Sequence, residues 1–354
     1  MLTRVDRVRT RLKERGLDGL VILRGNNMRY LSGFSGSSGV LYVDHRGVFL
    51  LSDFRYAEQA AAESPEFTFV LVKGDLLEPL ADLIRERGGT KVAVEDDYLS
   101  HQGYALLEAR MGSPLHSANG LVEGLRLVKD EAEIAALARA CRIADDALAE
   151  VLPQVRPGMT ENEVAARLEF VMRLKGSERA SFETIAASGP RSAMPHATAS
   201  ERRLQEGDLL TLDFGAVWGG YHSDITRTFV LGRPSPEQRE IYGLVREAQA
   251  LGLEAVRPGI TAAALDALVR ERIAAAGHGE HFGHSLGHGV GLAVHESPRL
   301  KDTDQTVLAP GMVVTVEPGV YIPGWGGVRI EDSVLVTAGG HRVLTGAPKV
   351  FELC

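Results

Sequence analysis

The sequence predicts a mixed protein of the α/β (α+β) type, built from two domains at residues 1–125 and 126–354. Three observations lead to this prediction. The chain has 354 residues, about twice the length of an average domain. In its first third, short β-type runs alternate with helical stretches. The remainder opens on a long helical pattern and contains an internal repeat.

The composition is typical of a soluble globular protein. Hydrophobic residues make up 44% and charged residues 24% of the chain. The net charge is −8 and basic residues do not cluster, which argues against nucleic acid or a membrane surface as a partner. The charged start and the lack of a long apolar run favour a cytoplasmic protein. The two cysteines, Cys141 and Cys354, exclude a disulfide framework.

Residues 1–125 are predicted to form a small auxiliary α/β domain. Apolar runs predict strands at Leu20–Leu23, Val40–Val43, Val48–Leu51 and Phe67–Val72. The Gly/Ser-rich segment Tyr30–Gly39 is interpreted as a turn region, because it lacks the ending of a phosphate-binding loop. Asp53, Arg55 and Tyr56 follow a predicted strand and favour a surface turn over a substrate contact.

A long helix is predicted at the start of the second domain. Asp130 and Glu133 have the spacing of a helix N-cap and capping box. Apolar residues then recur every three or four positions, at Ile134, Leu137, Cys141, Ala144 and Leu148.

The second domain contains a two-fold internal repeat. Three pairs of segments match in order: Arg156–Thr160 with Arg257–Thr261, Gly207–Asp213 with Gly311–Glu317, and Gly219–Asp224 with Gly326–Glu331. Each half therefore supplies two acids in equivalent positions. Two copies are too few for a solenoid. We expect two halves related by a pseudo-two-fold axis, with paired strands meeting at the centre.

The four repeated acids, Asp213, Asp224, Glu317 and Glu331, suggest a metal site. They are predicted on strands between apolar residues, where carboxylates are buried and repel one another unless cations neutralise them. Solvent-facing or salt-bridged acids are the alternative, and a more common one for any single acid. Because both halves of the repeat carry a matched pair of acids, we favour a metal site over solvent-facing or salt-bridged acids.

A further ligand is expected from the histidines. Five of the eleven fall within 18 residues, at His278, His281, His284, His288 and His295. They lie in a Gly-rich segment that reads as strand and loop. Four carboxylates and one imidazole suit two divalent ions such as Mn²⁺, Co²⁺ or Zn²⁺.

Rival interpretations of this segment are weaker. Gly283–Gly287 fits the G-x-S-x-G pattern of a serine hydrolase with Ser285 as nucleophile, but the predicted flanks are not strand and helix. A structural zinc site from His278, His281, His284 and His288 lacks the usual thiolates. The glycine spacing does not match a dinucleotide-binding loop.

Together these segments resemble the pita-bread metallopeptidases, in the branch of Xaa-Pro dipeptidase (prolidase) and aminopeptidase P. The matching motifs are Asp213 and Asp224 eleven apart, Gly287–Gly291 with His295 seven after His288, Val316–Gly319 and Val328–Asp332. Tyr30–Gly39 and Asp53–Tyr56 extend the resemblance to the branch's creatinase/prolidase-like N-terminal domain.

The resemblance implies a role for each matched residue. Asp213 is a terminal ligand of one metal, Asp224 and Glu331 bridge the two metals, and His288 and Glu317 bind the other. His196, in Met194-Pro-His196, and His295 hold the substrate and stabilise the developing oxyanion. Glu317 passes a proton to the leaving nitrogen, and His284 and Arg329 contact the substrate.

The function so implied is hydrolysis of the Xaa-Pro bond of small peptides by a homodimer with two divalent metals per chain, manganese first among them. We expect a dipeptidase, with an aminopeptidase acting on longer peptides as the alternative. Arg46, Arg55 and Arg329 are the candidates to read a proline carboxylate. A non-catalytic peptide-binding protein and a metal-free creatinase-like enzyme stay open, although retention of all five ligands argues against both.

Overall fold

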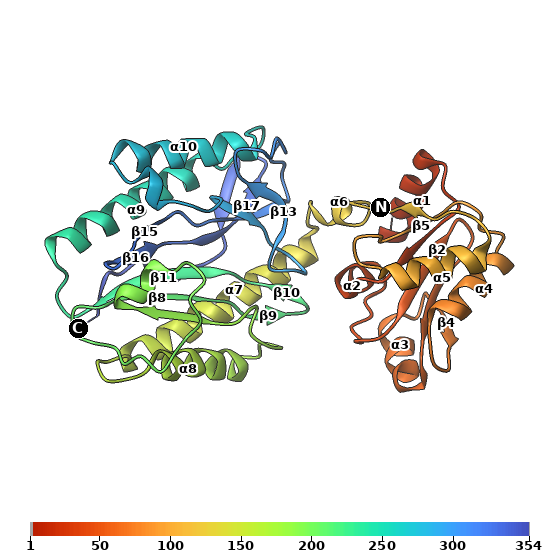
Figure 1. Ribbon diagram of the computed structural model, residues 1–354, viewed down its shortest axis with the longest axis horizontal. Helices are drawn as coiled ribbons and strands as arrows, with labels where there is room; N and C mark the ends of the chain where they lie inside the picture. The colour runs from red at the N-terminus through yellow and green to blue at the C-terminus, as the bar shows by residue number, and fades with distance from the viewer. Residues whose placement is uncertain (1–2, 354) are drawn as a thin grey trace. The chain divides into compact units, whose positions relative to one another are not determined.

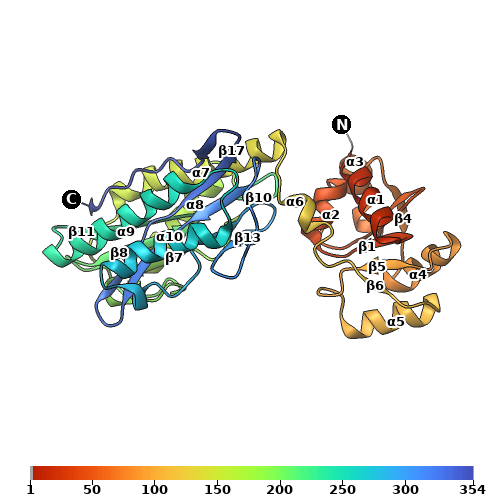
Figure 2. The ribbon, with the colours of Figure 1, turned by 90° about the horizontal axis from the view of Figure 1, so that it is seen from above.

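The structure is a computed structural model and describes residues 3–353. The chain divides into two compact units, Met1–Arg126 and Leu127–Cys354. Each is a mixture of helices and strands (Figures 1 and 2). Cys354 lies outside the described residues, whereas Cys141 is a buried free thiol.

The first unit is a six-stranded mixed sheet in the order β4-β3-β2-β1-β5-β6. Its strands are β1 (Gly19–Ile22), β2 (Val40–Asp44), β3 (Val48–Ser52), β4 (Thr68–Leu71), β5 (Val92–Val94) and β6 (His116–Ser117). Its helices are α1 (Arg4–Arg15), α2 (Gly25–Ser32), α3 (Ala57–Glu63), α4 (Leu77–Glu86), α5 (His101–Met111) and α6 (Glu123–Arg126). Buried apolar side chains of β1, β2, β3 and α4 share one core.

The four strands predicted in this unit are confirmed. The turn prediction for Tyr30–Gly39 is wrong at its start, because residues up to Ser32 continue helix α2. The helix ends only at Gly33, which adopts the left-handed φ of 83° that glycine tolerates. Asp53 caps the short 3₁₀ turn η1 (Phe54–Tyr56) and pairs with exposed Arg55 at 2.8 Å, as expected of a surface turn.

The second unit begins with the predicted long helix, α7 (Glu131–Val151), and its capping box between Asp130 and Glu133 is present. The first half continues through the 3₁₀ turn η2 (Leu152–Gln154), α8 (Glu161–Leu174), β7 (Ile185–Ser188) and the 3₁₀ turn η3 (Gly189–Ala193). It ends with β8 (Leu209–Phe214), β9 (Val217–Trp218), β10 (Tyr221–His222) and β11 (Ile225–Leu231).

The second half repeats this succession. It contains α9 (Pro236–Ala255), α10 (Ala262–Ala275), the 3₁₀ turn η4 (Gly279–His281), β12 (Gly287–Gly289), β13 (Glu296–Leu300) and β14 (Val313–Val316). It continues with β15 (Gly319–Ile322), β16 (Gly326–Arg329), β17 (Asp332–Thr337) and β18 (Gly340–Val343), and the short β19 (Glu352–Leu353) returns to the first half. The two larger sheets run β19-β11-β8-β7 and β13-β12-β14-β17-β18, and β9 with β10 and β15 with β16 form two-stranded sheets. This is the predicted pita-bread fold, with a helix pair for each half.

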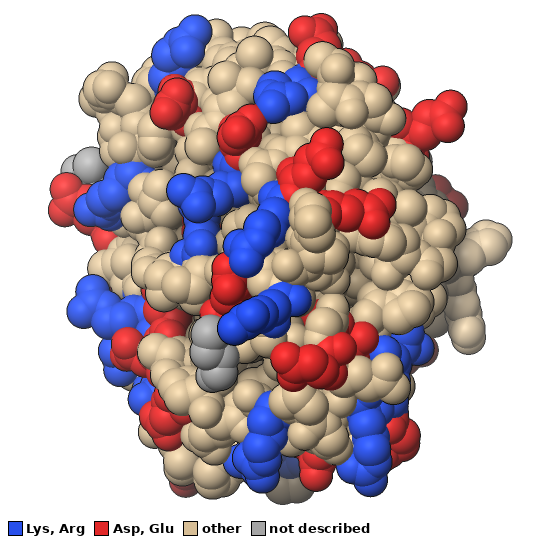
Figure 3. Space-filling model, turned by 90° about the vertical axis from the view of Figure 1, so that its left-hand side faces the viewer, with Lys and Arg blue, Asp and Glu red and all other residues tan. Residues whose placement is uncertain are grey.

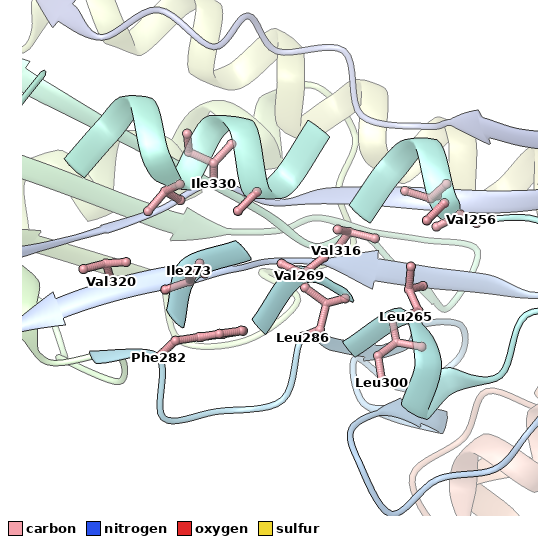
Figure 4. Close-up of a cluster of buried hydrophobic side chains, with 14 of the residues drawn as sticks. Val256, Leu265, Val269, Ile273, Phe282, Leu286, Leu300, Val316, Val320 and Ile330 are labelled. Atoms are coloured by element: carbon pink, nitrogen blue, oxygen red, sulfur yellow. The ribbon is translucent and has the colours of Figure 1, made fainter. Parts of the chain in front are cut away.

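Helices cover the outer sides of the strands (Figure 1). Helices α7 and α8 share a core with β7, β8 and β11. Helices α9 and α10 share another with β14, β16 and β17, which Figure 4 shows around Val269, Leu286 and Val316. The inner sides of the strands are thereby left to the polar residues of the repeat.

The acids lie at strand ends, which corrects the prediction that they lie within strands. Only Asp213 is inside a strand, near the end of β8. Glu317 follows β14, whereas Asp224 and Glu331 directly precede β11 and β17. A carboxylate just beyond a strand end is free of the sheet's alternation and can turn toward a common centre.

The repeat extends to backbone conformation. Gly158 and Gly259, at matched positions of the Arg-Pro-Gly segments, have φ values of 92° and 91°. The side chains of Thr160 and Thr261 then cap α8 and α10 by accepting from the backbone N–H three residues on, and Thr160 adds a capping box with Glu163. Both halves therefore enter their second helix through the same glycine turn.

We expect Gly158→Ala and Gly259→Ala to destabilise the protein equally, by about 1–2 kcal/mol each, because an L side chain resists this φ. No atom lies within 4 Å of a Cβ added at either position, so the cost is backbone strain alone. Gly243→Ala, inside α9 with the same open surroundings, is the control and is expected to stabilise slightly. Denaturant unfolding measures all three, and unequal costs would contradict the equivalence of the two turns.

None of the helices between residues 3 and 353 combines the length and apolarity needed to span a membrane. On the face shown in Figure 3, basic and acidic side chains are interspersed.

Candidate active site

A cavity of about 600 Å³ lies in the second unit, between its two halves. Every residue predicted for the site lines it except Glu331, which lies beside Asp224 and His288. The structure thus brings together all nine predicted site residues: His196, Asp213, Asp224, His284, His288, His295, Glu317, Arg329 and Glu331.

The centre of the site is a cluster of buried ligand atoms. One atom each from Asp224, His288 and Glu331 lie within 4.8 Å of one another. The Nε2 atom of His288 is 3.5 Å from Asp224 and 3.2 Å from Glu317. Such spacing allows one cation to be shared by several of these side chains.

The carboxylates are poorly satisfied by the protein itself. The Oδ1 atom of Asp213 and the Oε1 atom of Glu331 are buried without a hydrogen-bond partner. Burial, followed by the charges of neighbouring acids, raises the pKa of Asp224 and of Glu331 well above the usual range. These unpaired oxygens and crowded charges fit divalent cations of oxygen preference.

His288 has the tautomer that a metal ligand needs. Its Nδ1 lies 3.0 Å from the carbonyl oxygen of Gly289, which can only accept, so Nδ1 carries the proton. Nε2 therefore presents its lone pair to the cluster. The Oε1 atom of Glu317 lies 3.2 Å from this Nε2 atom, so the two are placed to bind one cation together.

Arg329 holds Asp213 in place. Its guanidinium is buried and donates to Asp213 Oδ2 at 2.7 Å, to Thr226 at 3.0 Å and to the hydroxyl of Tyr321 at 2.8 Å. Burial and the acid Glu317 raise the pKa of Asp213, which Arg329 opposes. Arg329 lines the cavity, but its guanidinium is bonded to the predicted metal ligand Asp213 and to the hydroxyl groups of Thr226 and Tyr321.

The three remaining predicted histidines line the cavity but differ in their hydrogen bonding and surroundings. His284 is engaged at both nitrogens, by the carbonyl oxygen of Ser285 and the hydroxyl of Tyr321, each at 2.8 Å. The His295 ring packs edge-on against His288 at 4.4 Å, and burial lowers the pKa of His295 to about 4. His196 is exposed at the cavity with its ring nitrogens unengaged by described residues.

The rival interpretations find no support in the geometry. Ser285 lies between the 3₁₀ turn η4 and strand β12, not on a strand-to-helix elbow. His278 and His281 approach each other at 3.1 Å, whereas His284 bonds Tyr321 and His288 belongs to the acidic cluster. The four histidines therefore do not form one zinc site.

Several residues of the cavity are not found by sequence reasoning. Phe182, Ile185 and Val294 supply apolar wall, and Glu183 and Arg299 supply opposite charges. Arg299 stands directly opposite His288 in the β12–β13 pair, so both side chains share a face. This assignment needs the pairing register of the two strands, which local sequence does not record, so no sequence signal singles out Arg299.

Behind the cluster, Arg227 fixes the chain that carries Glu331. This buried guanidinium donates to the carbonyl oxygen of Glu331 and pairs with Asp332 at 2.8 Å. No sequence pattern marks Arg227 as buried beside the strand that follows Glu331. From the sequence, an arginine in a strand is expected to be exposed.

Comparison with known proteins agrees with this geometry. Residues 135–338 match the model of metallopeptidase family M24, and residues 4–128 match the creatinase/prolidase N-terminal domain. The Xaa-Pro dipeptidase of Pyrococcus horikoshii is 39% identical over 94% of both chains. Solved structures of an Xaa-Pro dipeptidase from Bacillus anthracis and an X-Pro aminopeptidase from Thermotoga maritima are 43% and 36% identical. They superpose with TM-scores of 0.96 and 0.93, and each comparison covers 99% of this chain and at least 99% of the other. Family model, relatives and fold agree: this chain belongs to metallopeptidase family M24 and carries the creatinase/prolidase N-terminal domain.

Proposed function

We propose that this enzyme is an Xaa-Pro dipeptidase that hydrolyses the bond preceding proline with two divalent metal ions per chain. The observation that carries the proposal is the group of four carboxylates and one imidazole at the cavity, in which Asp224, His288 and Glu331 are buried together and two carboxylate oxygens are unpaired. The P. horikoshii relative and the B. anthracis structure bear the name of this activity.

Asp213, Asp224, His288, Glu317 and Glu331 would hold the metals, with Asp224 and Glu331 shared between the two. Asp224 and Glu331 suit sharing because they lie together at the centre of the cluster and the charges of the other acids raise the pKa of each. Divalent ions at such a site polarise a carbonyl group and make water a nucleophile near neutral pH. Manganese suits the mostly oxygen ligand set, as do cobalt and zinc.

The chain's own residues bind the peptide and move its protons. Glu317 passes a proton to the nitrogen of proline as the bond breaks. His295 is neutral near pH 7, since its pKa is about 4, and serves as a neutral N–H donor to the carbonyl oxygen as charge develops. His196, unengaged at the cavity, assists it. His284, held by Tyr321, forms part of the proline pocket.

Arg299 favours a dipeptide over a longer peptide. It is an exposed cation on the cavity wall, and its guanidinium has no ion-pair partner among residues 3–353. Its position opposite His288 puts it beside the metal cluster. The carboxylate of a C-terminal proline offers the two oxygens that a guanidinium binds best, whereas an internal proline offers none. Arg299 is therefore the residue that we expect to bind the proline carboxylate. The sequence alone suggested Arg46, Arg55 or Arg329 for this role.

We expect kcat/KM for Ala-Pro to exceed that for Ala-Pro-Ala by about tenfold or more, and Arg299→Gln to remove most of this preference by slowing Ala-Pro alone. Steady-state hydrolysis of both peptides measures it. Arg233→Gln is the control, since Arg233 is exposed and absent from the cavity lining. Equal or faster cleavage of the tripeptide by the wild type would make this enzyme an aminopeptidase.

A non-catalytic peptide-binding role is the alternative of another class. The complete ligand set disfavours it, because a binding protein has no need for unpaired buried carboxylates. The homodimer and the cytoplasmic location remain predictions from the sequence.

A further inference from the structure

Glu183 is an acid on the cavity wall that the proposed mechanism does not use. It lies just before β7, between Phe182 and the buried Thr184, and its side chain is exposed to the cavity. Within residues 3–353, no hydrogen bond or ion pair engages its carboxylate. Asp213, Glu317 and Glu331, by contrast, all accept hydrogen bonds within the cluster.

Strand geometry gives the direction from the metal cluster to Glu183. Ile185 stands directly opposite Asp213 in the β7–β8 pair. Glu183 precedes Ile185 by two positions, so the chain between them spans at most about 7 Å, and both side chains line the cavity. It is therefore near the cluster, yet outside it.

The two unpaired charges of the cavity lie on opposite halves of the repeat. Arg299 extends from β13 of the second half, whereas Glu183 belongs to the first half. A dipeptide with its proline carboxylate at Arg299 and its scissile carbonyl at the cluster directs its other residue toward the β7 wall. Phe182 and Ile185 line that wall as an apolar surface for the stem of a side chain.

We propose that Glu183 is a specificity-determining residue for the amino acid that precedes proline, favouring a lysine or arginine side chain over an acidic one. The inference rests on the proposed Xaa-Pro hydrolysis and goes beyond it. A long cationic side chain can lie along Phe182 and Ile185 and set its charged end at Glu183. An aspartate or glutamate in that place meets a like charge instead.

The test compares kcat/KM on Lys-Pro, Leu-Pro and Asp-Pro for the wild type and for Glu183→Gln, which keeps the shape and removes the charge. The ratio of Lys-Pro to Asp-Pro is expected to fall about fivefold, because a partly solvated ion pair and its like-charge counterpart are both lost. Leu-Pro is expected to change less than about twofold. Glu183→Lys is expected to invert the ratio in favour of Asp-Pro.

Glu169→Gln is the matched control, since Glu169 is an exposed acid on α8 away from the cavity. An unchanged ratio in both Glu183 variants would overturn the inference. An equal loss on all three peptides would also overturn it, by assigning Glu183 to the common α-amine. If the wild type hydrolyses none of the three, the proposed function itself fails, a result distinct from either of these.

Discussion

Replacing His288 by alanine is expected to lower kcat/KM on Ala-Pro by about 10³-fold or more. The variant loses the imidazole whose lone pair faces the acidic cluster and lies 3.2 Å from Glu317, and with it one predicted metal ligand. Glu331→Gln is expected to cost as much, because it keeps the shape of the side chain while removing a shared negative charge. Elemental analysis should find less metal bound to both variants.

Ser285→Ala is the control for these two variants. Ser285 lines the same cavity, one residue after His284. Its replacement therefore measures how much any substitution in the cavity wall lowers activity. We expect it to keep activity within about threefold of the wild type, since its hydroxyl bonds no imidazole within the described chain. A severe loss in Ser285→Ala together with a mild one in His288→Ala would restore the serine hydrolase.

Removal of metal is expected to abolish hydrolysis, and addition of Mn²⁺, Co²⁺ or Zn²⁺ to the chelated protein to restore it. Without metal, the charge of Arg329 does not offset burial and the neighbouring acids, so the pKa values of Asp224 and Glu331 stay well above the usual range. Hydrolysis at the wild-type rate by protein shown by elemental analysis to be free of metal would rule out the metallopeptidase mechanism.

Chelation also predicts a pH dependence of stability. The pKa values of Asp224 and Glu331 are raised in the folded apo protein, so the folded state binds protons that the unfolded state has released. The free energy of unfolding of the apo protein should therefore fall as pH rises from about 4 toward the raised pKa values. Metal should suppress the fall, and thermal unfolding of both forms between pH 5 and about 8 measures it. A chelated protein as stable at pH 8 as at pH 5 would contradict this account.

The ligands could be predicted because the repeat presents each acid twice. A lone acid such as Asp213 is most often exposed to solvent or salt-bridged. Its match with Glu317 at the equivalent position of a second copy favours a metal site over these two explanations. Periodicity could not show that Asp224, Glu317 and Glu331 lie at strand ends, because a strand's last residue depends on where its partner stops.

Arg299 and Glu183 could not be predicted in the same way. Each is a single charge in a polar stretch, which in most proteins lies on an ordinary surface. Their importance depends on pairing registers, Arg299 with His288 across β12 and β13 and Ile185 with Asp213 across β7 and β8. Registers are set by tertiary packing, which local sequence does not record.

The division of the ligand set between the halves bears on how such a molecule could arise. Asp213 and Asp224 belong to one half, while His288, Glu317 and Glu331 belong to the other, and the halves share helix succession, glycine turns and cap residues. A single ancestral half would have carried two acids and had no second wall to its cavity. It would have had to meet another copy of itself to complete four carboxylates. On this view the second unit of the present chain is a covalently joined homodimer whose two copies have since diverged, one now holding two aspartates and the other two glutamates and the histidine.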